Sequence, residues 1–188
     1  MIKLADRLHN MRTMESMPAH KQVKIASETL FIYAPMAHRL GLYNIKTEME
    51  DLSLKYTEPE VYRDIAMKMK AVQADEIRSL QRFSSPIKTA LKTEGIKFTV
   101  KERTKSIFSI RRKMVNQGIT FDEVYDRFAI RIILDVPLEQ EKAACWKAYS
   151  VVTDFYRPNP DRLRDWISSP KSNGYESLHT TVMGPDGH

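Results

Sequence analysis

The chain has a single cysteine, Cys145, among its 188 residues. One cysteine can form neither an intrachain disulfide nor a cysteine-cluster zinc site, so we expect a reducing compartment. No apolar run approaches the roughly 20 residues that a membrane-spanning helix needs. No secretory signal opens the chain, and it has no internal repeat or low-complexity tract. What is present, 42% hydrophobic and 29% charged residues, is ordinary for a soluble globular protein.

The charge is basic overall and unevenly placed. The formal net charge is +6, which weakly favours polyanionic partners. The segment 96–115 carries only one acidic residue, Glu102. Its seven basic residues are Lys97, Lys101, Arg103, Lys105, Arg111, Arg112 and Lys113. Such a run suits nucleotide phosphates or RNA, and an ordinary solvated helix face explains it equally well.

The spacing of apolar residues predicts a helical first half. Leu4, Leu8 and Met11 follow the i, i+4, i+7 pattern of an amphipathic helix. Further helices are expected at 21–39, kinked or divided by Pro35, then at 45–56, and from Pro59 onward. A break is expected at Ser84-Ser85-Pro86, before a last segment, "IKTALKTEG", that ends at Gly95.

Beyond residue 95 the pattern changes. It predicts a strand at 96–103, a helix at 106–118, a central strand at 125–136, a helix at 138–156, a long loop, and a last strand at 180–184. This order is typical of an α/β or α+β fold, with a boundary near residue 95.

Asp126 stands at the start of the apolar strand "YDRFAIRIIL". A carboxylate at the end of a sheet is a common ligand for Mg²⁺ beside a phosphate chain. The alternative is an aspartate at a strand end that simply faces solvent.

A second candidate site lies in "RTKSIFSI". Arg103 and Lys105 stand between a strand and a helix start, where backbone N–H groups and cations together bind phosphate. Lys105, Ser109 and Lys113 follow an i, i+4, i+8 spacing, which would place them in one line. A solvated stripe remains an equal alternative.

The stretch "SSPKSNGYESLHTT" carries a third cluster. Pro170 and Asn173-Gly174 predict a turn. Around it lie Arg162, Arg164, Lys171, Asn173, Tyr175 and His179. An aromatic ring for stacking, cations for phosphates and an imidazole that binds phosphate or handles a proton would suit a nucleotide. A lone Tyr or His is more often packed in a core, but the cluster is a stronger signal than any member.

The first helix offers Asp6 and Asn10 on one face, as a possible metal ligand and a ligand contact. Polar residues at i and i+4 usually form only the solvated face of a helix.

Several segments together resemble one family. The segment "KLADRLHNMRT" resembles the last metal-binding motif of the HD hydrolase domain in RelA/SpoT-type alarmone synthetase/hydrolases, and "YAPMAHRLGLYNIKTEMEDLSL" is similar to the helical connection that follows it. The segments "RTKSIFSIRRKM", "FDEVYDRFAIRIIL" and "RLRDWISSPKSNGYESLHTTV" resemble, in order, the motifs of the synthetase domain. Five motifs in the same order make the resemblance specific.

The resemblance implies an α+β chain: the end of an HD domain at 1–20, a helical linker at 21–95, and at 96–188 a synthetase domain with a nucleotidyltransferase-like mixed sheet and flanking helices. The family transfers pyrophosphate from ATP to the 3′-hydroxyl of GDP or GTP, and its hydrolase domain removes it using Mn²⁺. The expected location is cytoplasmic. Ribosome and tRNA contacts are expected only through domains outside this chain.

The resemblance also assigns residues. It implies that Asp126 holds Mg²⁺ and that Arg103, Lys105, Ser109 and Lys113 hold the ATP phosphates. Arg162, Arg164, Lys171, Asn173, Tyr175 and His179 would serve the acceptor nucleotide, with Tyr175 stacked on guanine and His179 also at the reaction centre. Asp6 would be a Mn²⁺ ligand and Asn10 a contact to the hydrolase's nucleotide.

Some positions depart from the family pattern. The basic motif "RLRD" has Arg164 where bifunctional members usually have Lys, which keeps the charge and favours a bifunctional parent. Glu102, Thr104 and Glu176 replace a usual Gly, Pro and Gln, and these changes bear on substrate preference.

Two expected motifs are not found in the sequence: a His-Asp pair for the hydrolase and the downstream "ExQIR"-like strand of the synthetase. We therefore expect this chain by itself to be inactive in both directions. A basic RNA-binding module and a helical interaction scaffold remain as alternatives.

Overall fold

A computed structural model describes residues 1–172 and 174–184 of the chain. Its contacts divide the chain into two compact units, each built from two segments. Unit 1 comprises Met1–Gln73 and Lys105–Arg127, and unit 2 comprises Ala74–Thr104 and the residues from Phe128 onward. The predicted α+β class is confirmed, whereas the boundaries predicted at residues 20 and 95 stay predictions.

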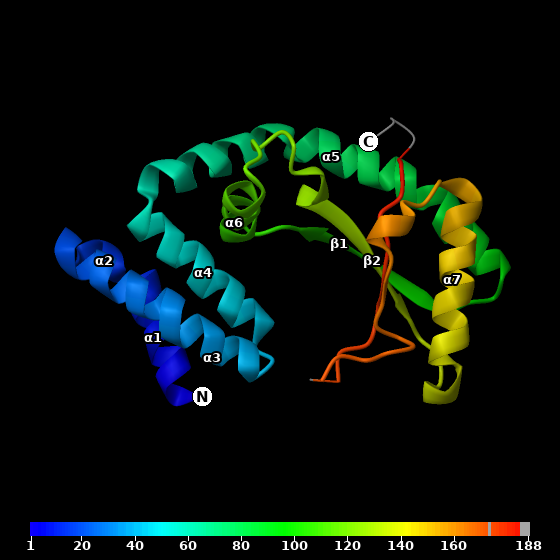
Figure 1. Cartoon of the computed structure of the whole chain (residues 1–188), viewed down its shortest axis with the longest axis horizontal. Helices are drawn as coiled ribbons and strands as arrows, with labels where there is room; N and C mark the ends of the chain where they lie inside the picture. Colours follow the sequence, from blue (N-terminus) through cyan, green and yellow to red (C-terminus); the bar gives the residue numbers. More distant parts are fainter. Residues whose placement is uncertain (173, 185–188) are drawn as a thin grey trace. The chain divides into compact units, whose positions relative to one another are not determined.

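Unit 1 is helical (Figure 1). Its helices are α1 (Ile2–Arg12), α2 (Ala19–Glu28), α3 (Ala34–Arg39), α4 (Tyr43–Thr57), the first part of α5 (Pro59–Thr93) and α6 (Ile107–Gln117), with short 3₁₀ turns at Met14–Ser16 and Tyr125–Arg127. The apolar stripe predicted for the first helix is confirmed, because Leu4, Leu8 and Met11 are its buried residues. Leu4 and Leu8 pack with Ala34 and Met49, so α4 shares a core with α1 and α3.

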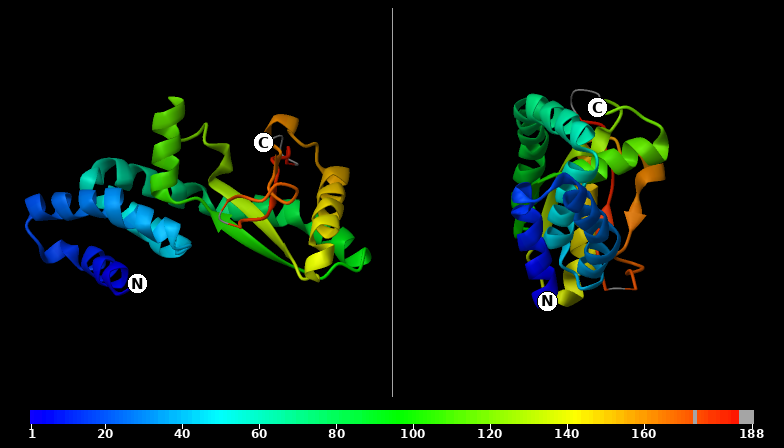
Figure 2. Two further views of the ribbon diagram at one scale, coloured as in Figure 1. Left: turned by 60° about the horizontal axis from the view of Figure 1, so that its bottom comes forward. Right: turned by 90° about the vertical axis from the view of Figure 1, so that its left-hand side faces the viewer.

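Near Pro35 the second predicted helix changes its hydrogen-bond pattern but is not broken. A π-helical turn, Thr29–Tyr33, joins α2 to α3, and Pro35 stands in the first turn of α3, where it has no N–H to donate to the preceding turn. The views in Figure 2 show α2 and α3 following one another along nearly the same line. Gly41, with φ of +72°, ends this region in a left-handed conformation that glycine adopts without strain.

Unit 2 combines helices with short sheets. It contains the rest of α5, β1 (Phe98–Thr104), β2 (Phe128–Leu134), α7 (Glu141–Phe155), β3 (Arg164–Asp165) and β4 (Leu178–His179), with 3₁₀ turns at Leu138–Gln140 and Pro160–Arg162. β1 pairs antiparallel with β2, from Phe98 opposite Leu134 to Thr104 opposite Phe128. Ile87 and Leu91 of α5 pack with Val151 and Val152 of α7, and apolar side chains of β1 and β2 cover this core.

Three predictions about these elements are wrong. Helix α5 does not break at Ser84-Ser85-Pro86 but continues to Thr93 with Pro86 inside it. The tertiary core explains this, since Ile87 and Leu91 beyond the proline are fully buried and hold the last turns in place.

The described strands form two separate two-stranded antiparallel sheets rather than one mixed sheet with a central strand. The last strand lies earlier than predicted, at Leu178–His179, and Val182 makes only an isolated bridge with Pro158.

Among the helices of the described part, none is both long and apolar enough to cross a membrane.

Candidate functional site

Two lysines converge on the carboxylate of Asp126 in unit 1. Lys105 Nζ lies 2.8 Å from Oδ2, and Lys113 Nζ lies 2.6 Å from Oδ1. Asp126 belongs to the 3₁₀ turn before β2, while Lys105 follows β1 and Lys113 lies on α6. About half of the Asp126 side chain is exposed (46%), whereas the lysine side chains are largely covered, at 23% and 16%.

The two lysines set the ionisation of Asp126. Partial burial works to raise its pKa, but the hydrogen bonds and charges of Lys105 and Lys113 outweigh burial and lower the pKa from 3.8 to about 2. Asp126 is therefore ionised at neutral pH and carries one negative charge between two positive ones. Such a trio can give one lysine to an anionic oxygen while Asp126 stays paired with the other lysine.

The lysine–serine line predicted from sequence forms only in part. Lys105 precedes α6, whose N-cap is Ser106, so Lys105 and Lys113 meet through Asp126 rather than along one helix face. Ser109, on the first turn of α6, accepts a hydrogen bond from the Ser106 hydroxyl at 2.9 Å.

The backbone N–H groups at the start of α6 already have acceptors. The N–H of Phe108 donates to Asp51 Oδ1 at 2.8 Å, and that of Ser109 donates to Ser106 Oγ at 3.2 Å. The sequence pattern predicted that N–H groups at this helix start would hold phosphate, but in the structure these two are engaged by the protein itself.

Arg103 belongs to unit 2, unlike Lys105. It lies on β1 opposite Ala129 of β2. Within unit 2 its charge acts on His179, as does that of Arg131 from β2. The structure thus associates Arg103 with the residues of the third sequence cluster.

In that cluster, Lys171 lies over two aromatic rings. Its Nζ is 4.6 Å from the centre of the Trp166 ring and 5.4 Å from that of Tyr175. The Tyr175 hydroxyl lies 2.9 Å from His179 Nε2. The N–H of Lys171 donates to the Tyr175 carbonyl, and that of Gly174 to the Lys171 carbonyl, which confirms the predicted turn. Lys171, Tyr175 and His179 are therefore brought together, as the sequence predicted.

His179 is surrounded by positive charge. Burial, followed by the charges of Lys171, Arg103 and Arg131, lowers its pKa below the usual 6.5. The imidazole is therefore neutral at pH 7, and it keeps one nitrogen lone pair able to accept a proton.

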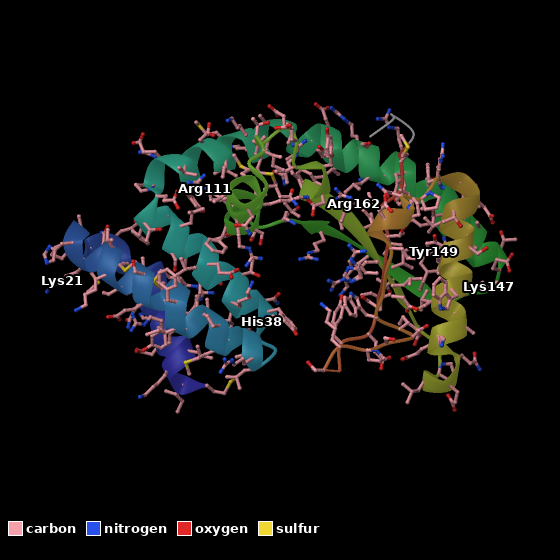
Figure 3. All side chains as sticks on the ribbon, in the orientation of Figure 1. Lys21, His38, Arg111, Lys147, Tyr149 and Arg162 are labelled. Atoms are coloured by element: carbon pink, nitrogen blue, oxygen red, sulfur yellow. The ribbon has the colours of Figure 1, made fainter. Side chains whose placement is uncertain are left out.

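The two arginines nearby have local roles that the sequence did not reveal. Arg164, on β3 opposite His179, donates from Nη1 to the carbonyls of Asp161 and Leu163, so its charge partly serves to hold the preceding turn. Arg162, labelled in Figure 3, is the last residue of that 3₁₀ turn and is exposed. Asn173 lies outside the described residues.

On α1, the side chains of Asp6 and Asn10 contact each other. Asn10 Nδ2 donates to Asp6 Oδ2 at 3.4 Å. Among the described residues, no three His, Cys, Asp or Glu side chains gather in a way that could hold a metal ion. The assignments of Asp6 to Mn²⁺ and of Asn10 to a nucleotide stay predictions, as do those of the other site residues.

Sequence reasoning missed Trp166, Arg131 and Asp51. Trp166 had a usable signal, because it is one of only two tryptophans and lies between Arg164 and Lys171. Asp51 had none, since its partner Phe108 is 57 positions away in sequence.

Comparisons with known proteins agree with the motif order. The family described as "Region found in RelA / SpoT proteins" matches residues 102–188, and the HD domain family matches residues 1–43.

Similar proteins match almost the whole chain. It is 44% identical over 97% of its length to a probable guanosine-3′,5′-bis(diphosphate) 3′-pyrophosphohydrolase of Synechocystis. It is 41% identical over 98% of its length to a GTP pyrophosphokinase of Myxococcus xanthus. It is 41% identical over 100% of its length to the bifunctional (p)ppGpp synthase/hydrolase SpoT of Escherichia coli. The chain spans 24%, 24% and 26% of the lengths of these three relatives.

Proposed function

The chain belongs to the RelA/SpoT family, and from this premise we propose that it is part of a bifunctional cytoplasmic enzyme that makes and hydrolyses ppGpp. In the synthetic direction the enzyme transfers pyrophosphate from ATP to the 3′-hydroxyl of GDP or GTP. This chain contributes groups for both nucleotides, and its own lack of turnover remains a prediction.

The observation that carries the proposal is the pairing of Asp126 with Lys105 and Lys113 at 2.8 and 2.6 Å. Phosphoryl-type transfer depends mostly on positioning and on neutralising phosphate charge. The two lysines supply positive charge for the phosphates, and the half-exposed carboxylate beside them supplies negative charge for a metal ion. With ATP bound, the triphosphate oxygens would pair with the two ammonium groups, and Asp126 would then be available to hold a divalent cation.

Asp126 fits Mg²⁺ by its chemistry. Mg²⁺ in nucleotide sites is usually held by one or two carboxylates together with substrate phosphates and water, and Asp126 is ionised and half exposed. Bound there, the ion would neutralise phosphate charge in the transition state. Asp6, hydrogen-bonded to Asn10, could supply only one of the ligands of a Mn²⁺ ion, and no group of three or more possible ligands forms among the described residues.

For the acceptor nucleotide, the supporting group is Lys171 with Trp166 and Tyr175. The rings offer faces on which a guanine base can stack, and the lysine offers a charge for its phosphates. His179, neutral at pH 7 and hydrogen-bonded to Tyr175, can accept a proton from a nearby hydroxyl.

Isothermal titration calorimetry with a non-hydrolysable ATP analogue, with and without Mg²⁺, tests the proposal. We expect Mg²⁺-dependent binding that weakens about tenfold or more in Asp126→Asn, because a charge-assisted contact is lost. Asp64→Asn is the matched control, since Asp64 also pairs with a lysine, Lys68, but on the exposed surface of α5. An affinity for the ATP analogue that changes neither with Mg²⁺ nor in Asp126→Asn would contradict the proposal.

The RNA-binding alternative makes a different prediction in the same experiment. Its signature is binding of single-stranded RNA with a steep salt dependence and no response to Asp126→Asn or Tyr175→Ala. Against it, three of the seven cations in 96–115 already pair with carboxylates: Lys105, Lys113 and Arg111.

A further inference from the structure

Asp51 is a partly buried carboxylate with no place in the chemistry above. It lies on α4, next to the buried residues Glu50 and Ser53. Its Oδ1 accepts the N–H of Phe108 at 2.8 Å, and the backbone of Ile107 and the side chain of Ser106 also act on it through hydrogen bonds. The Asp51 carboxylate, on α4, therefore accepts hydrogen bonds at the N-terminus of α6.

The charged form of Asp51 is partly desolvated where it lies. Burial raises its pKa and outweighs the lowering by the hydrogen bonds from α6, so these hydrogen bonds offset only part of the desolvation cost. A partly buried carboxylate is stabilised when it faces the positive end of a helix dipole. Helix α4 is itself fixed, because its Met49 is fully buried against α1 and α3.

A second contact joins the same two helices. Arg111, labelled in Figure 3 on α6, donates from Nε and Nη2 to Glu58 Oε2, at 3.0 and 2.7 Å. Glu58 directly follows α4 as its C-cap. Helix α6 is thus attached to α4 at its first turn by Asp51 and one turn later by Arg111.

These attachments determine where the two lysines stand. Lys105 directly precedes Ser106, the N-cap of α6, and Lys113 lies on α6 two residues beyond Arg111. A shift or rotation of α6 would move Lys113 relative to Lys105 and so open the pairing with Asp126.

We propose that Asp51 is a positioning residue for the triphosphate site: by holding the N-terminus of α6, it keeps Lys105 and Lys113 converged on Asp126. Because the N–H of Phe108 is already hydrogen-bonded to Asp51, the lysine side chains, and not that backbone group, bind the triphosphate. This inference rests on the proposed function and adds a residue on α4, far away in sequence, that controls affinity for the triphosphate.

Two measurements on the 188-residue chain test it. The first is amide hydrogen exchange by NMR, which measures how firmly Asp51 holds the N-terminus of α6 and needs no nucleotide. We expect Phe108 and its neighbours at 107–110 to exchange about tenfold faster in Asp51→Ala, and less so in Asp51→Asn, which keeps an acceptor oxygen. Unchanged exchange in both variants would overturn the proposal.

The second measurement is the affinity for the ATP analogue with Mg²⁺, compared with that for GDP. The expected result is about tenfold weaker ATP-analogue binding in Asp51→Ala, partial rescue in Asp51→Asn, and unchanged GDP binding. Equal losses for both nucleotides would show a general structural defect and contradict a positioning role. Asp64→Asn should change neither value.

The two experiments separate the two proposals. If the unaltered chain binds no ATP analogue, the proposed function fails, while the exchange data still decide whether Asp51 anchors α6. If Asp51→Ala does not fold, Asp51→Asn alone carries the test. Faster exchange at 107–110 with undiminished ATP-analogue affinity would refute the link between the anchor and the lysines.

Discussion

The hydroxyl of Tyr175 lies 2.9 Å from Nε2 of His179, and the two rings meet edge to face with their planes at 80°. The contact joins an aromatic residue that follows the loop turn to the second residue of β4. Lys171 lies over the Tyr175 ring as well. A base that stacks on Tyr175 must therefore take the opposite face or displace the lysine, and its affinity depends on the ring more than on the hydroxyl.

Tyr175→Phe and Tyr175→Ala separate these two contributions. Because Phe keeps the ring, we expect it to weaken GDP binding by no more than about 1 kcal/mol, the net value of one hydrogen bond. Because Ala removes the stacking surface, we expect a loss of roughly 1–3 kcal/mol. Isothermal titration calorimetry with GDP measures both. Equal losses in the two variants would show that the hydroxyl, and not the ring, carries the affinity.

Lys171→Met should raise the pKa of His179. Burial lowers this pKa first, and the charge of Lys171 is the next cause, so removing the charge moves the value toward 6.5 without fully restoring it. NMR titration of the imidazole protons measures the change, and Lys142→Met, outside the groups that act on His179, serves as the control. An unchanged titration curve would mean that Lys171 does not act on His179 in solution.

The same shift has a consequence for stability. Because the folded-state pKa of His179 lies below the unfolded value, the unfolded chain binds the proton more readily. The cost of keeping the imidazole neutral is absent above the unfolded pKa and grows as the pH falls below it, until the folded form is protonated too. Lys171→Met should therefore flatten the loss of stability between neutral and mildly acidic pH, as thermal unfolding across that range would show.

Replacing the lysines around Asp126 should move its pKa in two stages. Lys105→Met or Lys113→Met alone leaves one cation, so we expect the pKa to rise from about 2 toward 3.8. In the double variant only the effect of burial remains, and the pKa should exceed 3.8. Carbon-13 NMR titration of the Asp126 carboxyl group measures each value. A double variant that still titrates near 2 would exclude the lysines as the cause.

The sign of the linked stability follows from the lowered pKa. The contribution of the Asp126 pairs is present above the unfolded value near 3.8 and is lost as the pH falls through the folded value of about 2. The difference in stability between the unaltered chain and Lys113→Met should accordingly persist at neutral pH and shrink below pH 3.8.

Local pattern was enough to predict most helices and the turn that gathers Lys171, Tyr175 and His179. The apolar stripe of α1 and the irregular helical turn just before Pro35 depend only on neighbours within a few residues, and such signals are visible in sequence. The convergence of Lys105 and Lys113 was predicted for the wrong reason, since they meet through Asp126 and not along a helix face.

The rest depends on contacts between distant segments. The hydrogen bond from Phe108 to Asp51 joins residues 57 positions apart, and that from Arg111 to Glu58 joins residues 53 positions apart. No spacing rule predicts either pair. The continuity of α5 is of the same kind. Proline weakens a helix locally, but burial of Ile87 and Leu91 against α7 outweighs that cost.

Leu91→Ala tests whether this core holds the end of α5. Leu91 is fully buried against α7, so its truncation leaves a cavity and should lower the free energy of unfolding by about 2–5 kcal/mol. Lys92→Ala, at the adjacent exposed position, should change it by no more than about 0.5 kcal/mol. Urea denaturation followed by circular dichroism measures both. If α5 instead broke at Ser84-Ser85-Pro86, as the sequence pattern predicted, and the segment beyond the break did not pack against α7, the two variants would unfold alike.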